Sequence, residues 1–207
     1  MIVDPSFAWL DDAAFNDYSQ FGEDGVLQAI FSIIRPANEW CFECGAADGL
    51  FFSNTRRLIE QGWHAVLAEA DDRSFARLLE NTAPFGDRVK CTKQVVGSTC
   101  RIDGLLHLAG APLDIDLVVI DVDGQDFYLF NHILQYRPRV VMVEFDQNAD
   151  EDFIPTLDGA GQAGALAITK LARGKFYQLV HLSRCNGIFV QQSPARLLRG
   201  SREQMLK

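Results

Sequence analysis

The chain has 207 residues, of which 48% are hydrophobic and 23% are charged, a balance typical of a globular protein with one full core. Its formal net charge of −9 disfavours contact with a phosphate backbone, so we expect no nucleic-acid partner. No run approaches the roughly eighteen uncharged apolar residues of a membrane span, and the first residues do not resemble a signal peptide. We therefore expect no membrane partner and a cytoplasmic location.

Hydrophobic runs of strand length alternate with helical patterns along the chain, which predicts βαβ units and a parallel sheet. The predicted helices are 24–34, 56–61, 73–81, 102–108, 127–134 and 165–173. The predicted strands are 40–44, 64–69, 88–96, 116–120, 140–145, 177–183 and 187–191. Because only three residues separate the last two strands, they predict an antiparallel hairpin. We expect a single domain over residues 1–207, with its core at about 18–192 and a tail at 193–207.

The longest irregular segment is 146–164, which follows the fifth predicted strand. A loop of this length in a compact domain is typical of a lid or a binding surface, so it is the candidate for a moving part. The five cysteines are an odd number scattered along the chain, which is typical of a reducing compartment. Cys41 and Cys44 form a C-x-x-C pair, but no second pair follows at zinc spacing, and we interpret both as core thiols.

Polar residues follow the first three predicted strands at the ends where ligands collect in open parallel sheets. Glu43, Gly45 and Gly49 follow the first strand, with a glycine spacing looser than the G-x-G-x-x-G that wraps a pyrophosphate. The spacing favours a nucleoside without phosphates. Glu69 lies twenty residues after Gly49, at the place from which a carboxylate accepts both hydroxyls of a ribose. Gly97-Ser98 either faces an adenine edge or forms a plain turn.

The stretch IDVDGQD, residues 120–126, begins like a calcium loop but does not continue as one. Counted from Asp121, glycine falls at the fourth place instead of the sixth, and His132 holds the twelfth place, where an EF-hand has glutamate. The lead-in is an apolar strand rather than a helix. We instead expect Asp121 and Asp123 to surround one crevice with Glu144, which lies at the end of the neighbouring strand, and a cationic ligand would relieve the mutual repulsion of these acids.

The order of these motifs resembles the FkbM-like methyltransferases, which are class I enzymes that depend on S-adenosylmethionine. The resemblance covers about residues 18–190. Its motifs are YSQ-x-GEDG at 18–25, E-x-G-x-x-x-G at 43–49, NT at 54–55, Glu69, ID-x-LL at 102–106, D-x-DG-x-D at 121–126 and EF at 144–145. The resemblance implies an α/β, Rossmann-like three-layer sandwich with a mostly parallel seven-stranded sheet. It also implies methylation of a hydroxyl on a sugar, polyketide or similar small molecule or glycan.

Carried over to this sequence, the resemblance assigns a role to each motif. Glu43, Gly45 and Gly49 would hold the methionine portion of the donor, Glu69 its ribose, and Asp121 would lie near its amino or sulfonium end. Where the family often has Glu, this chain has Asp123.

Two further positions keep two interpretations each. Gln20, together with residues 22–24, either forms part of the wall of the donor site or belongs to an ordinary acidic helix cap. Asn54 either steadies the loop or caps the helix that follows it.

Transfer of a methyl group to a hydroxyl also needs a group that takes the hydroxyl proton. Asp121, Asp123 or Glu144 is the expected base, and the alternative is a Mg²⁺ or Ca²⁺ ion held by two of them, which we do not favour. His132 and His181 are further candidates, although each is also typical of a core or surface histidine.

Two other classes of protein compete with a methyltransferase. A nicotinamide-dependent oxidoreductase would need the tighter glycine pattern, and a non-catalytic nucleoside-binding or scaffolding protein would not need the acids of the crevice. A homodimer is compatible with the sequence.

Overall fold

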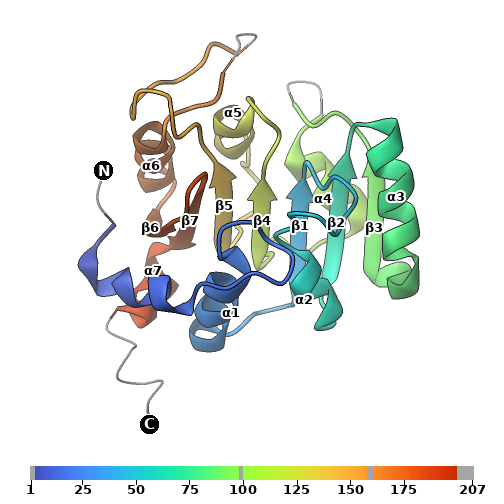
Figure 1. The fold of residues 1–207 in the computed structure, drawn as a ribbon, viewed down its shortest axis with the longest axis horizontal. Coiled ribbons are helices and arrows are strands. Elements are labelled where there is room, and N and C mark those ends of the chain that lie inside the picture. The colour runs from blue at the N-terminus through green and yellow to red at the C-terminus, as the bar shows by residue number, and fades with distance from the viewer. Residues whose placement is uncertain (1–2, 98–99, 158–160, 200–207) are drawn as a thin grey trace.

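The computed structural model describes residues 3–97, 100–157 and 161–199. It contains one seven-stranded sheet in the order β3-β2-β1-β4-β5-β7-β6, in which β7 alone runs antiparallel to its neighbours (Figure 1). The strands are β1 (Trp40–Cys44), β2 (His64–Glu69), β3 (Val89–Lys93), β4 (Leu117–Ile120), β5 (Val140–Glu144), β6 (Tyr177–Leu182) and β7 (Asn186–Gln191). The predicted α/β fold with a closing antiparallel hairpin is confirmed.

Helices cover both faces of the sheet and complete three layers (Figure 1). One face bears Cys41, Val119 and Met142 and is covered by a first group of helices. This group is η1 (Pro5–Ala13), α1 (Glu23–Ile34), α2 (Arg56–Glu60), α3 (Asp72–Thr82) and α7 (Gln192–Leu198). The other face bears Phe42 and Val118 and is covered by α4 (Ile102–Ala109), α5 (Asp126–Asn131) and α6 (Ala165–Gly174). Because both faces are buried, the central strands are continuous apolar runs.

The predicted limits of the core were too narrow at both ends of the chain. Residues 5–13 form the 3-10 helix η1, whose Phe7 and Leu10 are buried. Residues 192–198 form α7 instead of the start of a tail, and Leu198 is fully buried. The Trp9 indole N–H donates a hydrogen bond to the Leu198 carbonyl at 2.9 Å, which joins the two segments. Each segment buries two or three apolar side chains, too few for a clear periodic pattern.

Two other predicted elements were too long. The third strand ends at Lys93 instead of Val96, because the chain turns away after the Gln94 N–H donates to the Glu69 carbonyl. The 3-10 helix η2 (Ala83–Arg88) precedes this strand. Helix α5 ends at Asn131 instead of Leu134. None of the helices in the described residues is long and apolar enough to cross a membrane.

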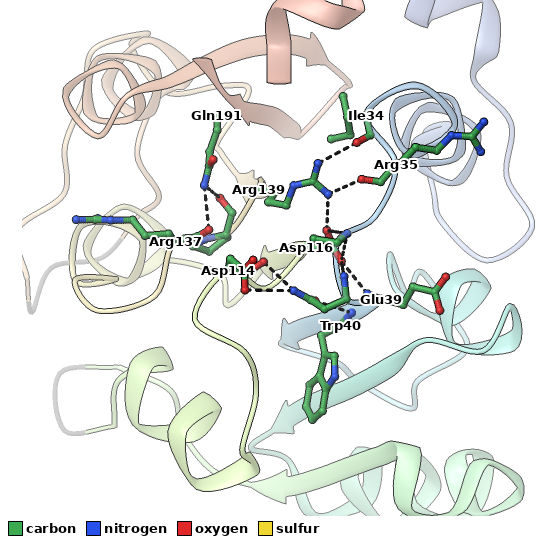
Figure 2. Close-up of polar contacts among 12 residues, drawn as sticks. Ile34, Arg35, Glu39, Trp40, Asp114, Asp116, Arg137, Arg139 and Gln191 are labelled. Carbon is green, nitrogen blue, oxygen red and sulfur yellow. Dashed lines mark hydrogen bonds and ion pairs between the residues drawn. The ribbon is translucent and has the colours of Figure 1, made fainter. Parts of the chain in front are cut away.

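At the amino edge of the sheet, the fully buried Asp116 holds the chain that leads into β1 (Figure 2). Its carboxylate accepts hydrogen bonds from the backbone N–H groups of Ala37, Asn38 and Glu39 and from the Arg139 guanidinium at 2.8 Å. Arg139 also donates to the Ile34 carbonyl at the end of α1. This network fixes α1 and β1 relative to β4 and β5. Because the same strands end at the carboxyl edge of the sheet, it also fixes their positions there.

Candidate functional site

The strands β2, β1, β4, β5 and β7 place one row of residues across the carboxyl edge of the sheet. Cys44 pairs with Ala68 and with Ile120, so the next step of the register places Gly45 between Glu69 and Asp121. Ile120 pairs with Val143, which places Asp121 beside Glu144. Glu144 in turn pairs with Asn186. The row therefore reads Glu69, Gly45, Asp121, Glu144, Asn186.

Gly45 stands where no side chain fits. Its φ is +75°, and a Cβ atom added to it would lie 1.6 Å from the Asp121 carbonyl oxygen. The N–H groups of Gly45 and Ala46 both donate to the Ala68 carbonyl at 3.1 Å. The loop after β1 is therefore held tightly against the ends of β2 and β4, and only glycine permits this approach.

A cavity of about 440 Å³ opens at this edge, within the size range of small-molecule sites. Its walls come from the ends of four strands. The lining residues are Gly45, Ala47, Glu69, Ala70, Ser74, Gln94, Val95, Val96, Asp121, Val122, Asp123 and Gln125. Of the predicted cofactor residues, Gly45, Glu69 and Asp121 thus come together. Gly97 lies next to the lining residue Val96, and Ser98 lies outside the described residues.

The Glu69 carboxylate is largely occupied by the protein itself. It accepts hydrogen bonds from the backbone N–H groups of Ala47, Ala70 and Asp71 at 2.7–2.8 Å. A carboxylate offers about four acceptor positions, so about one remains for a ligand. The expectation that Glu69 accepts both ribose hydroxyls is therefore not supported in this conformation, which leaves room for one.

Glu43 has a different role from the predicted contact with a methionine portion. Its side chain is 3% exposed and accepts hydrogen bonds from Ser53 Oγ, the Asn54 N–H and Thr55 Oγ1. Burial raises the pKa of this carboxyl group. Glu43 is absent from the lining of the cavity and instead ties the loop before α2 to the sheet.

Two of the remaining predicted cofactor residues also position the loops around β1. Asn54 steadies its loop through its backbone N–H, and its side-chain Oδ1 is buried without a hydrogen-bond partner among the described residues. It does not cap α2, because the Ser53 hydroxyl accepts the Arg56 N–H instead. Gly49 packs against α3, where an added Cβ atom would lie 2.5 Å from Leu78.

The acidic start of α1 is a structural cap. The Asp24 carboxylate is buried and accepts hydrogen bonds from the N–H groups of Asp17, Tyr18 and Ser19. Gln20, on the same turn, is exposed and lies outside the lining of the cavity. Of the two interpretations of this motif, the contacts favour the cap.

Asp121 and Glu144 form a carboxyl pair that shares a proton. Burial raises the pKa of Asp121 to about 9, and the negative charge of Glu144 and a hydrogen bond to it add to this rise. Burial and the charge of Asp126 raise the pKa of Glu144 to about 7. The hydrogen bond raises the pKa of Asp121 and lowers that of Glu144, so the proton resides on Asp121. At neutral pH the pair therefore carries less negative charge than two free carboxylates would.

The other two acids of IDVDGQD differ in role. Asp126 is fully buried, and its carboxylate accepts the N–H groups of Val122 and Gly124 at 2.9 Å, which closes the loop after β4. Burial raises its pKa. Asp123 is exposed at the cavity wall with a left-handed φ of 55°. Within the described residues, no group of three or more His, Cys, Asp or Glu side chains is arranged to hold a metal ion.

The irregular segment after β5 contacts Glu144 at the carboxyl edge and two residues near the start of α5. Its described parts, 146–157 and 161–164, contain no helix or strand. The Gln162 amide donates to Glu144, the Gln125 amide to the Leu157 carbonyl, and the Tyr128 hydroxyl to the Pro155 carbonyl. In Figure 1 the segment rises above α5 and α6. Its motion as a lid stays a prediction.

The two candidate histidines lie outside the lining of the cavity. His181 is buried on β6, where burial lowers its pKa, and its Nδ1 lies 3.0 Å from Asp11. His132 is half-buried at the end of α5.

Sequence reasoning missed Asn186 and Gln162. Only the pairing of β5 with β7 reveals Asn186, whose Oδ1 is buried without a hydrogen-bond partner in the described part of the chain.

The sequence matches no protein-family model and no curated protein. Solved structures do share its fold. The amino-terminal domain of EvdMO1 with SAH bound superposes with a TM-score of 0.54 and 14% identity, over 82% of this chain and 80% of that one. The O-methyltransferase from Bacillus cereus in complex with SAH gives 0.52 and 15%, over 92% and 93%. A SAM-dependent methyltransferase from Aquifex aeolicus gives 0.50 and 10%, over 90% and 92%. The chain therefore has the Rossmann-like fold of class I methyltransferases.

Proposed function

We propose that this protein is an S-adenosylmethionine-dependent methyltransferase of the FkbM-like type, acting on a hydroxyl of a sugar, polyketide or similar small molecule or glycan. The observation that carries the proposal is the row at the carboxyl edge. This row contains the strand-end carboxylate of Glu69, the irreplaceable Gly45, and the acid pair that shares a proton. The row lies at a cavity whose size suits a small molecule. Solved proteins of this fold bind SAH in structures.

The residues present fit an adenosine-bearing sulfonium ligand. Glu69 retains about one acceptor position for a ribose hydroxyl, and Gly45 exposes its backbone where a ligand can approach. Asp121 lies at the other end of the lining, where the negative charge that its pair with Glu144 carries attracts a positive ligand. When bound, the ligand supplies an electrophilic methyl group, and the protein's part is to align it with the acceptor oxygen.

The acid pair supplies the proton chemistry in this proposal. Glu144 has a pKa of about 7, near the pH at which a general base works best, and it takes the proton of the acceptor hydroxyl. Asp121 keeps its own proton and donates a hydrogen bond to Glu144, which limits repulsion between the two groups. The Gln162 amide also donates a hydrogen bond to Glu144 and helps to orient it. A scaffolding protein has no use for such a pair, which favours an enzyme.

A thermal-shift comparison of three additives, S-adenosylhomocysteine, NAD and calcium, tests the proposal. We expect only S-adenosylhomocysteine to raise the melting temperature, because a ligand at a hundred times its Kd adds about 2.7 kcal/mol to the free energy of unfolding. Glu69→Gln should abolish most of that shift, since a charge-assisted hydrogen bond contributes about 1.5–3 kcal/mol. Glu80→Gln, an exposed change on α3, is the matched control. A shift with NAD alone would exclude the proposal.

A further inference from the structure

A second cavity lies at the amino edge of the sheet, away from the site described above. Its volume is about 820 Å³, and a neighbouring cavity of about 450 Å³ shares Gln192 and Arg196 with it. Its lining residues come from the segments where α6 passes into β6 and β7 into α7. The residues lining the larger cavity are Arg137, Gly174, Lys175, Phe176, Tyr177, Gln191, Gln192, Ser193 and Arg196. We call it the amino-edge groove.

The amino-edge groove is positively charged in a protein whose net charge is −9. Arg137, Lys175 and Arg196 line it, Arg199 lines the neighbouring cavity, and none of the lining residues of either is acidic. The remaining polar residues of the lining are glutamine, serine and tyrosine, which all carry hydrogen-bond donors. The Tyr177 hydroxyl and the Gln191 amide already donate to backbone carbonyls, so the groove offers its positive charge together with the donors of Gln192 and Ser193.

Within the part of the chain that the structure describes, two of these cations have partners and two have none. The Lys175 ammonium donates to the carbonyls of Asn131 and Ile133, and Arg199 pairs with Asp4 at 3.3 Å. The guanidinium groups of Arg137 and Arg196 have no hydrogen bond or ion pair with the described residues. In Figure 2, Gln191 binds the backbone of Arg137, while the Arg137 side chain extends away from the network around Asp116.

The cations also crowd one another. Burial lowers the pKa of Lys175, and the Arg137 charge lowers it further. An anion between these groups would relieve the repulsion. Guanidinium groups match phosphate oxygens with paired N–H donors, which makes a phosphoryl group a suitable anion.

Phe176 beside these cations is a residue that the fold does not require. It follows the C-cap of α6 with a left-handed φ of 66°, a position at which helices usually carry glycine. A bulky residue is strained there, and this ring is also 74% exposed. Strain and exposure at one residue point to a use outside folding, such as contact with the ring of a ligand.

We propose that the amino-edge groove binds a small organic phosphate, with its phosphoryl group between Arg137 and Arg196 and its ring against Phe176. The ligand is a small molecule, because the net charge of −9 repels a long polyanion while leaving a local site intact. The groove differs from the proposed donor cavity in place and in charge. The inference therefore stands apart from the proposed function.

Calorimetric titration with uridine 5′-diphosphate and with pyrophosphate tests the inference. Saturating S-adenosylhomocysteine is present in both, so that a nucleoside site at the carboxyl edge is occupied. We expect both ligands to bind. Arg137→Gln or Arg196→Gln should lower the affinity for both ligands about tenfold or more, because either change removes charge-assisted hydrogen bonds. Phe176→Gly should lower only the affinity for the nucleotide. The same change should raise the melting temperature of the protein, because it relieves backbone strain. Arg77→Gln, an exposed change on α3, should alter neither affinity.

Three results would overturn the inference. The first is no binding of either ligand at millimolar concentration. The second is binding that Arg77→Gln weakens as much as Arg137→Gln, which would indicate a diffuse attraction. The third is an equal loss of affinity for both ligands in the Phe176→Gly protein. Each of these outcomes is separate from the binding of S-adenosylhomocysteine, so the two proposals fail independently.

Discussion

The two ends of β4 carry aspartates in opposite circumstances. Asp116, before the strand, is fully buried and accepts three backbone N–H groups and the Arg139 guanidinium. Asp121, after the strand, has no cation near enough to lower its pKa. The charges that act on it are those of Glu144, Asp126 and Glu43, and all of them raise its pKa. Only the four residues of β4 separate the two along the chain. One carboxylate is satisfied by the fold, and the other is left with acids as neighbours.

This difference separates stability from function. A buried charge that has a cation and N–H donors holds elements together, whereas a buried acid among acids raises the free energy of the folded state. Natural folds retain such an arrangement mainly at sites where a ligand or a proton transfer uses it. The comparison therefore identifies the amino edge around Asp116 as the anchor and the carboxyl edge as the site.

The largest effect should come from breaking the anchor. Arg139→Met leaves the Asp116 charge without its cation, and we expect the free energy of unfolding to fall by about 3–5 kcal/mol in urea titrations. Arg137→Met, two residues earlier and unpaired among the described residues, should stay within about 0.5 kcal/mol of the wild type. Equal effects of the two changes would mean that the Asp116 network is not the anchor.

The next effect should come from the centre of the row at the carboxyl edge. Gly45→Ala adds left-handed strain and a clash with the Asp121 carbonyl, so we expect a loss of about 2–4 kcal/mol and no binding of S-adenosylhomocysteine. Gly104→Ala, in α4 with open space around it, should instead stabilise by about 0.5–1 kcal/mol. Chemical unfolding followed by calorimetry measures both. A Gly45→Ala protein that binds like the wild type would refute the close approach.

A smaller effect should appear in the dependence of stability on pH. The folded pKa values of Asp121 and Glu144, about 9 and about 7, lie above the usual 3.8 and 4.5. The folded state therefore holds more protons than the unfolded state, and this stability is present at acid pH and lost as the pH rises through 7 and 9. Asp121→Asn should reduce the fall in the free energy of unfolding with rising pH by at least about 1 kcal/mol, since one pKa unit corresponds to about 1.4 kcal/mol. Unfolding curves from pH 5 to 9 measure it, and an unchanged slope would contradict the shared proton.

Periodicity and strand-end chemistry predicted much of the fold. The limits of β1 and β2 agree with the prediction, because apolar runs bounded by polar residues mark buried strands clearly. The helices η1 and α7 were missed, because each buries only a few side chains, and those against partners far away in sequence, as Trp9 does at Leu198.

The site was predictable in place but not in detail. The row could be anticipated at Glu69, Gly45, Asp121 and Glu144, since each lies at the carboxyl end of a strand or directly after it. The roles of Glu43 and Asp126 could not, because they depend on which loop N–H groups reach each carboxylate. Asn186 required the register of the hairpin.

A crystal structure with S-adenosylhomocysteine tests the central claim most directly. We predict that its nucleoside lies against Gly45, with a ribose hydroxyl bound to Glu69 and the sulfur end toward Asp121. A ligand seated elsewhere, or a cavity that stays empty at saturating concentration, would contradict the account.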